Sequence, residues 1–393
     1  MDKVRIGVVG IGVIGKFHCK NIIKAASPDF CLAAVCTLTA EHAKAAGAEF
    51  GVPYFTKAQA MYDSGLLDAV IIATPHYWHA PLTIRAARSG LHVMCEKPLA
   101  STVGPAKAAI EECRRRGVVL AGMLQHRTRP IMQRIKKMVD SGEIGEVFRV
   151  SMICSNWFRT QAYYDSGAWR GTWDGEGGGV LINQAPHHLD LFTWIAGLPR
   201  RVVGLLGTRV HNIEVEDTAN FLCEYDGGKV GYIYATTGEL PGAEQFMVCG
   251  DKATVIAEHH KLRIGHLQYP IRDFTVGSIT ALADQEIKNK AEWTEEDYST
   301  NKGGQHIEVI RRFAAHVLRG EPLIATGEEA IGELELSNAM YLAGFKNKAV
   351  TLPVDPIEVD RLVAKLEKQR STGKGQGIRR RATRDLRKLL AAG

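Results

Sequence analysis

A strand that ends in a glycine-rich turn is the feature that most constrains how this chain folds. Residues 4–10 form an apolar, β-branched run, and Gly10-Ile11-Gly12-Val13-Ile14-Gly15 completes it. Such a run predicts a buried strand, and G-x-G-x-x-G between a strand and a helix is typical of a dinucleotide-binding turn. There, Gly10 permits the tight bend, Gly12 lets backbone N–H groups approach a pyrophosphate, and Gly15 lets the helix pack closely on the strand. We therefore predict a dinucleotide site at this turn.

The residues that follow alternate between strand and helix patterns. We expect strands at 32–36, 53–55, 69–73, 92–95 and 118–123, and helices at 17–25, 41–49, 81–89 and 103–116. Alternation at this pace predicts an α/β fold, a doubly wound parallel sheet with right-handed crossovers. We assign residues 1–124 to this Rossmann domain.

The pattern changes after residue 125. Strands expected at 147–153, 218–224 and 229–236 end in short turns, and helices are expected at 131–141, 187–196 and 306–318. This mixture predicts a second, α+β domain over residues 125–353, built on a mostly antiparallel sheet. Residues 354–393 form a helical and basic extension, interpreted either as a solvated arm or as a clamp on a neighbouring subunit.

The charge of the chain is concentrated at its end. Residues 361–393 hold eleven Lys and Arg against two acidic residues, so the other 360 residues carry a net charge near −3 although the whole chain carries +6. The tail lacks the interleaved aromatic residues of a nucleic-acid site, so we expect no nucleic-acid partner.

The apolar residues and cysteines narrow the class of protein further. No run of 18 apolar residues and no signal-peptide pattern occurs, so no membrane association is expected. The eight cysteines include no C-x2-C pair, which argues against a zinc ribbon or a dithiol motif and favours a reducing, cytoplasmic location. No H-E-x-x-H pattern accompanies the histidines, so no metal is expected.

The choice between NAD and NADP depends on the end of the second strand. An acidic residue there would bind the ribose hydroxyls of NAD, and a nearby Arg would favour the phosphate of NADP. Thr37 occupies the position and no Arg is close. Both cofactors remain open, with a preference for NAD.

Two further motifs stand at the ends of predicted strands, Thr74-Pro75 with His79 and Glu96-Lys97-Pro98. The carboxyl ends of parallel strands face the ligand crevice, so Lys97 is expected to point toward the nicotinamide. The positive charge of an oxidised nicotinamide lowers the pKa of a nearby lysine, which suits proton relay.

With these motifs the chain resembles the Gfo/Idh/MocA family of NAD(P)-dependent sugar and cyclitol oxidoreductases. The resemblance covers about residues 3–355 and includes Ser141-Gly142-Glu143-Ile144-Gly145 and the segment from Gly177 to Asp190. It implies a Rossmann domain, an open antiparallel sheet in the second domain, and a homodimer or homotetramer formed through that sheet. The cofactor contacts predicted with it are Gly10, Gly12, Val13, Ile14, Gly15, Thr37, Thr74, Pro75, His79, Glu96, Lys97 and Gln125.

The resemblance also implies the catalytic residues. Lys97 is the catalytic lysine, often followed by a cis-proline, and His187 is the general base. Many members have Asp four residues before that histidine, where this chain has Asn183. Asn183 is the third predicted catalytic residue. The i, i+4 spacing predicts that Asn183 and His187 share one side of a helical turn and contact one substrate. Without a carboxylate at Asn183, the pKa of His187 is expected nearer its ordinary value of about 6.5 than in a relative that has Asp at this position.

The other histidines and the acidic residue near these motifs are interpreted as residues without a catalytic role. We interpret His188 as a hydrogen-bonded core residue, Asp190 as a structural acceptor, and His79 as a neighbour of the nicotinamide without a chemical role.

An aromatic segment precedes the motif and supplies candidate substrate residues. Arg159, Tyr163, Trp169 and Arg170 are predicted to bind the sugar with Asn183 and His187, since flat rings suit sugar C–H groups and Arg donates to hydroxyls. The alternative is that these rings cover the sheet or an interface.

Together these patterns predict an enzyme that transfers a hydride between a nicotinamide cofactor and a secondary hydroxyl of a sugar, glycoside or cyclitol. Two alternatives remain open. One is a redox-neutral, NAD-dependent glycoside hydrolase or eliminase, which would use the same Lys97 and His187. The other is a non-catalytic dinucleotide-sensing regulator, which would need no proton relay.

Overall fold

Six parallel strands form the first sheet, in the order β3-β2-β1-β4-β5-β6, within a computed structural model that describes residues 2–277 and 290–371. The strands are β1 (Val4–Val9), β2 (Phe30–Cys36), β3 (Tyr54–Phe55), β4 (Ala69–Ile72), β5 (His92–Cys95) and β6 (Leu120–Gly122). They alternate with α1 (Val13–Ala25), α2 (Ala40–Phe50), α3 (Ala58–Tyr62), α4 (His79–Arg88) and α5 (Val103–Arg116), and η1 (His76–Trp78) precedes α4. The strand order reverses between β1 and β4, which is where doubly wound sheets bind their ligands.

Most predicted elements of this sheet are confirmed within a few residues. The first helix is the main difference, because α1 begins at Val13 rather than at Phe17. Gly15 therefore lies inside the first turn of the helix, and the glycine motif forms the helix start itself.

Nine strands form the second sheet, in the order β14-β13-β12-β11-β7-β10-β9-β8-β15. They are β7 (Val147–Cys154), β8 (Arg201–Gly207), β9 (Thr218–Glu224), β10 (Val230–Thr236), β11 (Glu244–Gly250), β12 (Ala253–Glu258), β13 (Lys261–His266), β14 (Glu292–Asp297) and β15 (Val350–Thr351), with η3 (Asp226–Gly228) between β9 and β10. The pairs are antiparallel except β7 with β10. The predicted fold class, a Rossmann sheet followed by a mostly antiparallel one, is confirmed.

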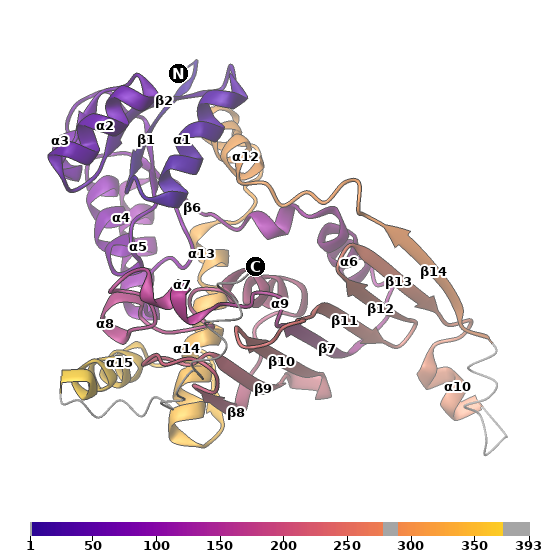
Figure 1. The fold of residues 1–393 in the computed structure, drawn as a ribbon. Helices are drawn as coiled ribbons and strands as arrows, with labels where there is room; N and C mark the ends of the chain where they lie inside the picture. Colours follow the sequence, from indigo (N-terminus) through magenta and orange to yellow (C-terminus); the bar gives the residue numbers. More distant parts are fainter. Residues whose placement is uncertain (1, 278–289, 372–393) are drawn as a thin grey trace, which may run out of the picture.

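Helices cover one side of this sheet, the side that faces the Rossmann part (Figure 1). The helices after β6 are α6 (Pro130–Asp140), α7 (Gln161–Asp165), α8 (Trp173–Glu176), α9 (Pro186–Ala196), α10 (Ile271–Gly277), α12 (His306–Arg319), α13 (Gly327–Ala330), α14 (Gly332–Lys346) and α15 (Pro356–Ser371), with η2 (Gln125–Thr128) before α6. Of these, α9 packs against β7 and α14 packs against β8. The opposite face of the sheet exposes Val203, Leu205, Leu222 and Val230.

After the strands of the second sheet, the chain returns to the Rossmann part. Helix α12 packs against α1 (Figure 1), and its Val309, Ile310 and Phe313 share a buried cluster with Ile6 of β1. The division at residues 124 and 125 remains a prediction, but residues 306–319 contribute to the core of the Rossmann part.

The start of the predicted C-terminal extension, residues 354–393, is also packed. Helix α15 lies against α5 and α8, and the Thr102 hydroxyl donates to Asp360 at 2.7 Å. The basic tail beyond residue 371 falls outside the described residues, and so do both interpretations of it.

Candidate active site

The glycine turn has the geometry of a dinucleotide cradle. Gly10 has a φ of +93°, and a Cβ on Gly15 would lie 1.8 Å from the Gly10 carbonyl oxygen. A Cβ on Gly12 would meet nothing within 4 Å. Gly10 and Gly15 are therefore required by the fold, whereas the space at Gly12 is open toward a ligand.

The surroundings of the turn fit a bound nucleotide. No side chain caps the N-terminus of α1, so its N–H groups can receive phosphate oxygens. Val13 and Leu38 are 91% and 89% exposed, which is unusual for apolar side chains beside a buried strand end. Thr37 directly follows β2 and precedes Leu38, and its backbone N–H donates to the Phe55 carbonyl.

His79 ties together the two strand-end motifs. One ring nitrogen lies 2.7 Å from the Thr74 carbonyl and the other 2.7 Å from the Pro98 carbonyl. The ring is 1% exposed, and the Lys97–Pro98 peptide bond is cis. Both nitrogens of His79 are occupied, so this residue braces the turn that presents Lys97.

Lys97 reaches across to the segment before α9. Its Nζ donates to the backbone carbonyl of Asn183 at 2.6 Å. Burial lowers the pKa of Lys97, and the charge of Arg159 lowers it further, while Glu96, Glu333 and Glu176 oppose that change. A lysine in this setting gives up its proton more easily than one in water.

Glu96 is held by a buried histidine. His18 Nε2 lies 2.6 Å from the Glu96 carboxylate, and the backbone N–H of Lys97 donates to the other oxygen at 3.3 Å. Burial alone would raise the pKa of Glu96, but the contact with His18 and neighbouring positive charges lower it to about 2. Glu96 is therefore ionised beside the lysine.

His187 lies at the start of α9, and its ring stacks on that of His126 with centroids 4.5 Å apart. The Gln125 side-chain amide lies 3.0 Å from its Nε2, while His187 Nδ1 and Gln125 Oε1 are buried without partners in the described chain. A half-turn of that amide would give Oε1 the Nε2–H as donor and leave Nδ1 with a free lone pair. His187 can then accept a proton at Nδ1.

The pKa of His187 does not stay near its ordinary value of about 6.5. Burial lowers the pKa of His187 well below that value, and the charges of His126, Lys97 and His306 act in the same direction. The prediction from the sequence considered only the residue at position 183, whereas the pKa of His187 depends on burial and on neighbours from other elements. His187 is a neutral imidazole at physiological pH.

The predicted helical pairing of Asn183 with His187 is also wrong. Helix α9 begins at Pro186, and Asn183 lies in the preceding turn, where its N–H donates to Gly179 at 3.0 Å. The Asn183 side-chain amide donates to Glu176 instead, at short range. Because Asn183 lies before the first turn of α9, the i, i+4 rule does not place its side chain beside that of His187.

Glu176 places a carboxyl group beside Asn183, the position where the family resemblance led us to expect an Asp. This residue is 1% exposed, and the Gly171 N–H donates to its Oε2 at 2.7 Å. Burial raises the pKa of Glu176 to about 7, although Arg170 and Lys97 oppose the change. Glu176 therefore titrates in the physiological range within reach of the lysine's charge.

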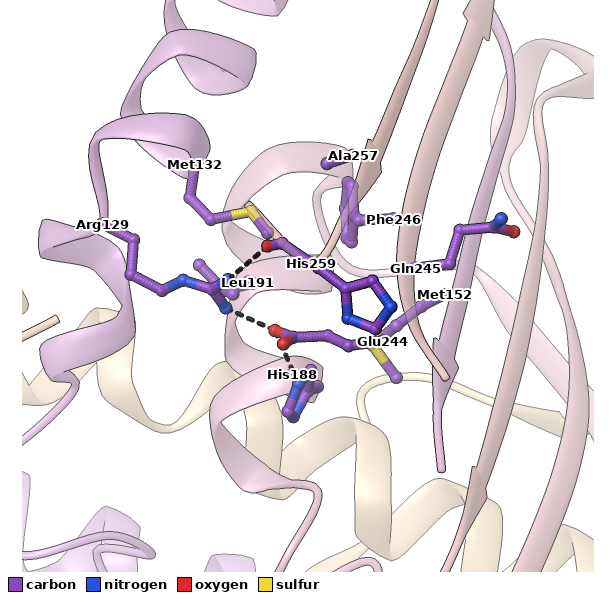
Figure 2. Close-up of a pocket in the computed structure, with 10 residues that line it drawn as sticks. All are labelled: Arg129, Met132, Met152, His188, Leu191, Glu244, Gln245, Phe246, Ala257 and His259. Atoms are coloured by element: carbon purple, nitrogen blue, oxygen red, sulfur yellow. Dashed lines mark hydrogen bonds and ion pairs between the residues drawn. The ribbon is translucent and has the colours of Figure 1, made fainter. Parts of the chain in front are cut away.

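His188 lines a small cavity between α6, α9 and the second sheet. Figure 2 shows the Glu244 carboxylate between Arg129 and His188. Burial alone would lower the pKa of His188, but contacts with Cys154 and Glu244 raise it to about 10. His188 is thus a hydrogen-bonded core residue, as predicted, and its charge helps to keep His187 neutral.

Asp190 is the structural acceptor that the sequence predicted. Its carboxylate receives two N–H groups of Arg127, at 2.7 and 2.9 Å, with both side chains buried. This pair joins η2, which carries Gln125, to the helix of His187.

The predicted substrate residues come together in one cluster. The Arg159 guanidinium lies 4.7 Å from the Tyr163 ring centroid, and that of Arg170 lies 4.4 Å from it. Arg170 also stacks on Trp169 at 4.4 Å and donates to the Tyr163 hydroxyl at 2.6 Å. Gln184 donates to the same hydroxyl at 3.4 Å, which links this cluster to the Asn183 turn.

Comparison with known proteins decides the family. The model of the Gfo/Idh/MocA oxidoreductase family with an NAD-binding Rossmann fold matches residues 4–123, and the model of the family's C-terminal domain matches residues 132–256. The chain belongs to the Gfo/Idh/MocA family. The predicted enzyme class, an oxidoreductase that uses NAD, is confirmed with it.

Several relatives of this Gfo/Idh/MocA protein are named dehydrogenases. The scyllo-inositol 2-dehydrogenase (NAD(+)) of Bacillus subtilis is 26% identical over 349 residues, which cover 86% of this chain and 93% of that protein. The D-glucoside 3-dehydrogenase of Escherichia coli is 25% identical over 367 residues, 86% of this chain and 94% of that one. The WlbA dehydrogenase of Chromobacterium violaceum, solved with NADH and UDP-GlcNAcA, matches with a TM-score of 0.76 and 28% identity, covering 90% of this chain and 97% of that one.

Sequence reasoning missed several groups of this Gfo/Idh/MocA site. Glu176, Gln184, His126, His306 and Glu333 all act on the predicted catalytic residues or contact the cluster beside them. Glu176 directly precedes the triple glycine and Gln184 follows Asn183, so their neighbours in the sequence were a usable signal. His306 and Glu333 come from α12 and α14, where no local pattern marked them.

The described residues show neither a metal site nor a membrane-spanning helix. Residues 2–277 and 290–371 contain no group of three His, Cys, Asp or Glu side chains arranged to hold a metal ion. Among the helices of the same ranges, none is both long and apolar enough to cross a membrane.

Proposed function

We propose that this protein is an NAD-dependent dehydrogenase that oxidises a secondary hydroxyl of a sugar, glycoside or cyclitol. The observation that carries the proposal is the meeting of Lys97, from the end of β5, with the turn that leads into the helix of His187. The carboxyl end of the parallel sheet and the second domain thus contribute one proton-transfer group each.

The cofactor would be held by the glycine turn at Gly10, Gly12, Val13, Ile14 and Gly15. Further contacts are assigned to Thr37, Thr74, Pro75, Glu96, Lys97 and Gln125, with His79 as the brace behind them. Bound NAD supplies the acceptor for the hydride that leaves the hydroxyl-bearing carbon.

His187 is assigned as the general base. Its low pKa keeps the imidazole neutral, and Nδ1 is the ring nitrogen without a partner. A neutral imidazole with one free lone pair can take the hydroxyl proton as the hydride leaves. Gln125 and His126 fix the ring by hydrogen bonding and stacking.

Lys97 is assigned to the substrate oxygen. Its Nζ holds the Asn183 carbonyl at 2.6 Å and has two further N–H groups for a ligand. Its lowered pKa eases proton exchange with that oxygen. Asn183 positions Lys97, because its backbone carbonyl accepts a hydrogen bond from Lys97 Nζ. Its side-chain amide donates to Glu176.

The relatives favour net oxidation over the redox-neutral alternative. Those compared above are named as dehydrogenases, and retention of both Lys97 and His187 argues against a non-catalytic sensor.

We further propose a cytoplasmic homodimer or homotetramer. All eight cysteines are free thiols, which suits a reducing compartment. On the open face of the second sheet, Leu222 pairs with Val203 on one side and Tyr232 on the other, and Leu205 lies nearby. This apolar face fits an isologous interface with a second copy.

The test is a screen of aldoses, methyl glycosides and inositols with NAD and, separately, NADP, followed by the absorbance of reduced nicotinamide. Substrate-dependent NADH that Lys97→Met does not form supports the proposal. Product release from a glycoside without net NADH would favour the redox-neutral alternative instead.

A further inference from the structure

Two arginines of the substrate cluster flank one aromatic ring. The Arg159 and Arg170 guanidiniums lie 4.7 and 4.4 Å from the centroid of Tyr163. A second ring supports each of them, Trp157 at 5.3 Å from Arg159 and Trp169 at 4.4 Å from Arg170. Stacking on flat rings holds each guanidinium in place and leaves its N–H edge available.

Neither guanidinium has a carboxylate partner within ion-pair distance in the ranges 2–277 and 290–371. The hydrogen bonds of Arg159 go to the Phe158 carbonyl and those of Arg170 go to the Tyr163 hydroxyl. Arg159 and Arg170 are half-buried, whereas the buried Arg127 has a carboxylate partner in Asp190. Two positive charges on one ring repel each other, so this arrangement favours a negative ligand.

Unpartnered polar atoms surround the pair. Arg159 Nε is buried without a hydrogen bond, and so is Gln184 Oε1, whose side chain is 6% exposed. Gln184 Nε2 donates to the Tyr163 hydroxyl, so its oxygen lies in the same cluster. Buried polar groups are almost always satisfied, which indicates that a ligand completes these two.

The cluster belongs to the reaction centre. The positive charge of Arg159 lowers the pKa of Lys97, and that of Arg170 lowers the pKa of Glu176. Gln184 follows directly on Asn183, whose carbonyl receives Lys97. A ligand that fills the cluster therefore lies beside the hydroxyl that Lys97 would hold.

We propose that Arg159 and Arg170 bind an anionic oxygen group of the substrate, so that this enzyme acts on a sugar bearing a carboxylate or a phosphate ester. Gln184 Oε1 accepts a hydrogen bond from a hydroxyl of the same sugar. This inference rests on the proposed function, since it names the charge class of the substrate for that reaction. Guanidinium forks suit either anion.

The experiment compares three ligands that differ at one carbon: methyl glucoside, methyl glucuronide and methyl glucoside 6-phosphate. For each, kcat/KM with NAD is measured, and the dissociation constant is measured by calorimetry with NADH present. We expect one of the anionic ligands to exceed the neutral one by about tenfold or more in both quantities, as charged hydrogen bonds provide. The two anionic arms distinguish a carboxylate from a phosphate.

Variants assign the preference to the cluster. Arg159→Gln and Arg170→Gln should each reduce the anionic-to-neutral ratio by about tenfold, and Arg159→Lys should restore part of it. The matched control is Arg263→Gln, because Arg263 also stacks on a tryptophan, Trp293, at 5.0 Å but lies on β13. NAD binding by each variant verifies that it is folded.

The outcomes separate this inference from the proposed function. Turnover of the neutral sugar at least equal to that of both anions would overturn the inference and leave the dehydrogenase intact. Tight, Arg159-dependent binding of an anionic sugar without NADH formation would support the binding site and count against the reaction. An anionic preference that survives both Gln variants would also overturn the assignment.

Discussion

Lys97 Nζ donates to the backbone carbonyl of Asn183 at 2.6 Å, and this bond joins the end of strand β5 to the turn before α9. The contact is made to the main chain, so it does not require Asp or Asn at position 183. Asn at this position, in place of the Asp that the family resemblance led us to expect, therefore leaves the lysine anchored. The side chain of Asn183 is directed to Glu176 instead.

Loss of the lysine amine should abolish turnover and spare cofactor binding. Lys97→Met keeps the apolar stem and removes the proton-exchanging group, so kcat should fall by about 10²- to 10⁴-fold. The dissociation constant for NADH, followed by its fluorescence, should change less than about threefold, since phosphate binding depends on the distant glycine turn. A near wild-type kcat would remove Lys97 from the mechanism.

Glu176 should produce a pH dependence near neutrality. Its pKa of about 7 means that the ionised form, the better acceptor for Asn183 and Gly171, predominates above that pH. Oxidation measured as kcat/KM should therefore rise through about pH 7. The charges that face Glu176 are those of Lys97 and Arg170. Glu176→Gln should flatten this rise, and Glu176→Asp should keep part of it; an unchanged profile in Glu176→Gln would assign the ionisation elsewhere.

Two partners of Arg127 should differ strongly in their effect on stability. Asp190→Ala leaves a buried guanidinium without its main partner, so the free energy of unfolding should fall by about 3–5 kcal/mol. Glu329→Ala removes a half-exposed partner of the same arginine and should cost about 1 kcal/mol or less. Urea denaturation compares the two directly. Equal effects would contradict the structural assignment of Asp190.

The glycines of the turn should separate ligand binding from folding. Gly12→Ala meets no protein atom within 4 Å, so the melting temperature should hold while NAD affinity falls by about tenfold. Gly15→Ala would place a Cβ 1.8 Å from a carbonyl oxygen and should destabilise the fold by at least about 2 kcal/mol. If Gly12→Ala bound NAD normally, the phosphate would lie elsewhere.

The open face of the second sheet should carry the subunit contact. Leu222→Lys puts a charge at the centre of the apolar patch and should lower the mass measured by light scattering. Ile357→Lys is the control, because Ile357 is 59% exposed on α15, away from this sheet. An unchanged mass for Leu222→Lys would exclude this face as the interface.

Much of the site was predictable because its motifs occupy fixed places in the fold. Lys97 follows a strand of a parallel sheet, and the carboxyl end of such a strand always faces the crevice. Arg159, Tyr163, Trp169 and Arg170 lie close together in the sequence, so their cluster was visible as a segment. His306 and Glu333 were not, because they come from helices that return to the site more than a hundred residues after His187.

Periodicity and local turn chemistry depend on neighbours along the chain, so the parallel sheet, the glycine turn and the side chains available for proton transfer were predictable from the sequence. The charge state of those side chains follows only from the folded structure. The pKa values of His187 and Glu176 follow from burial and from groups on other elements. Asn183 acts through its backbone carbonyl, and the direction of that carbonyl depends on a turn that the spacing of Asn183 and His187 did not predict. Electrostatic interactions act through space, so the catalytic properties of these residues depend on contacts between segments far apart in the sequence.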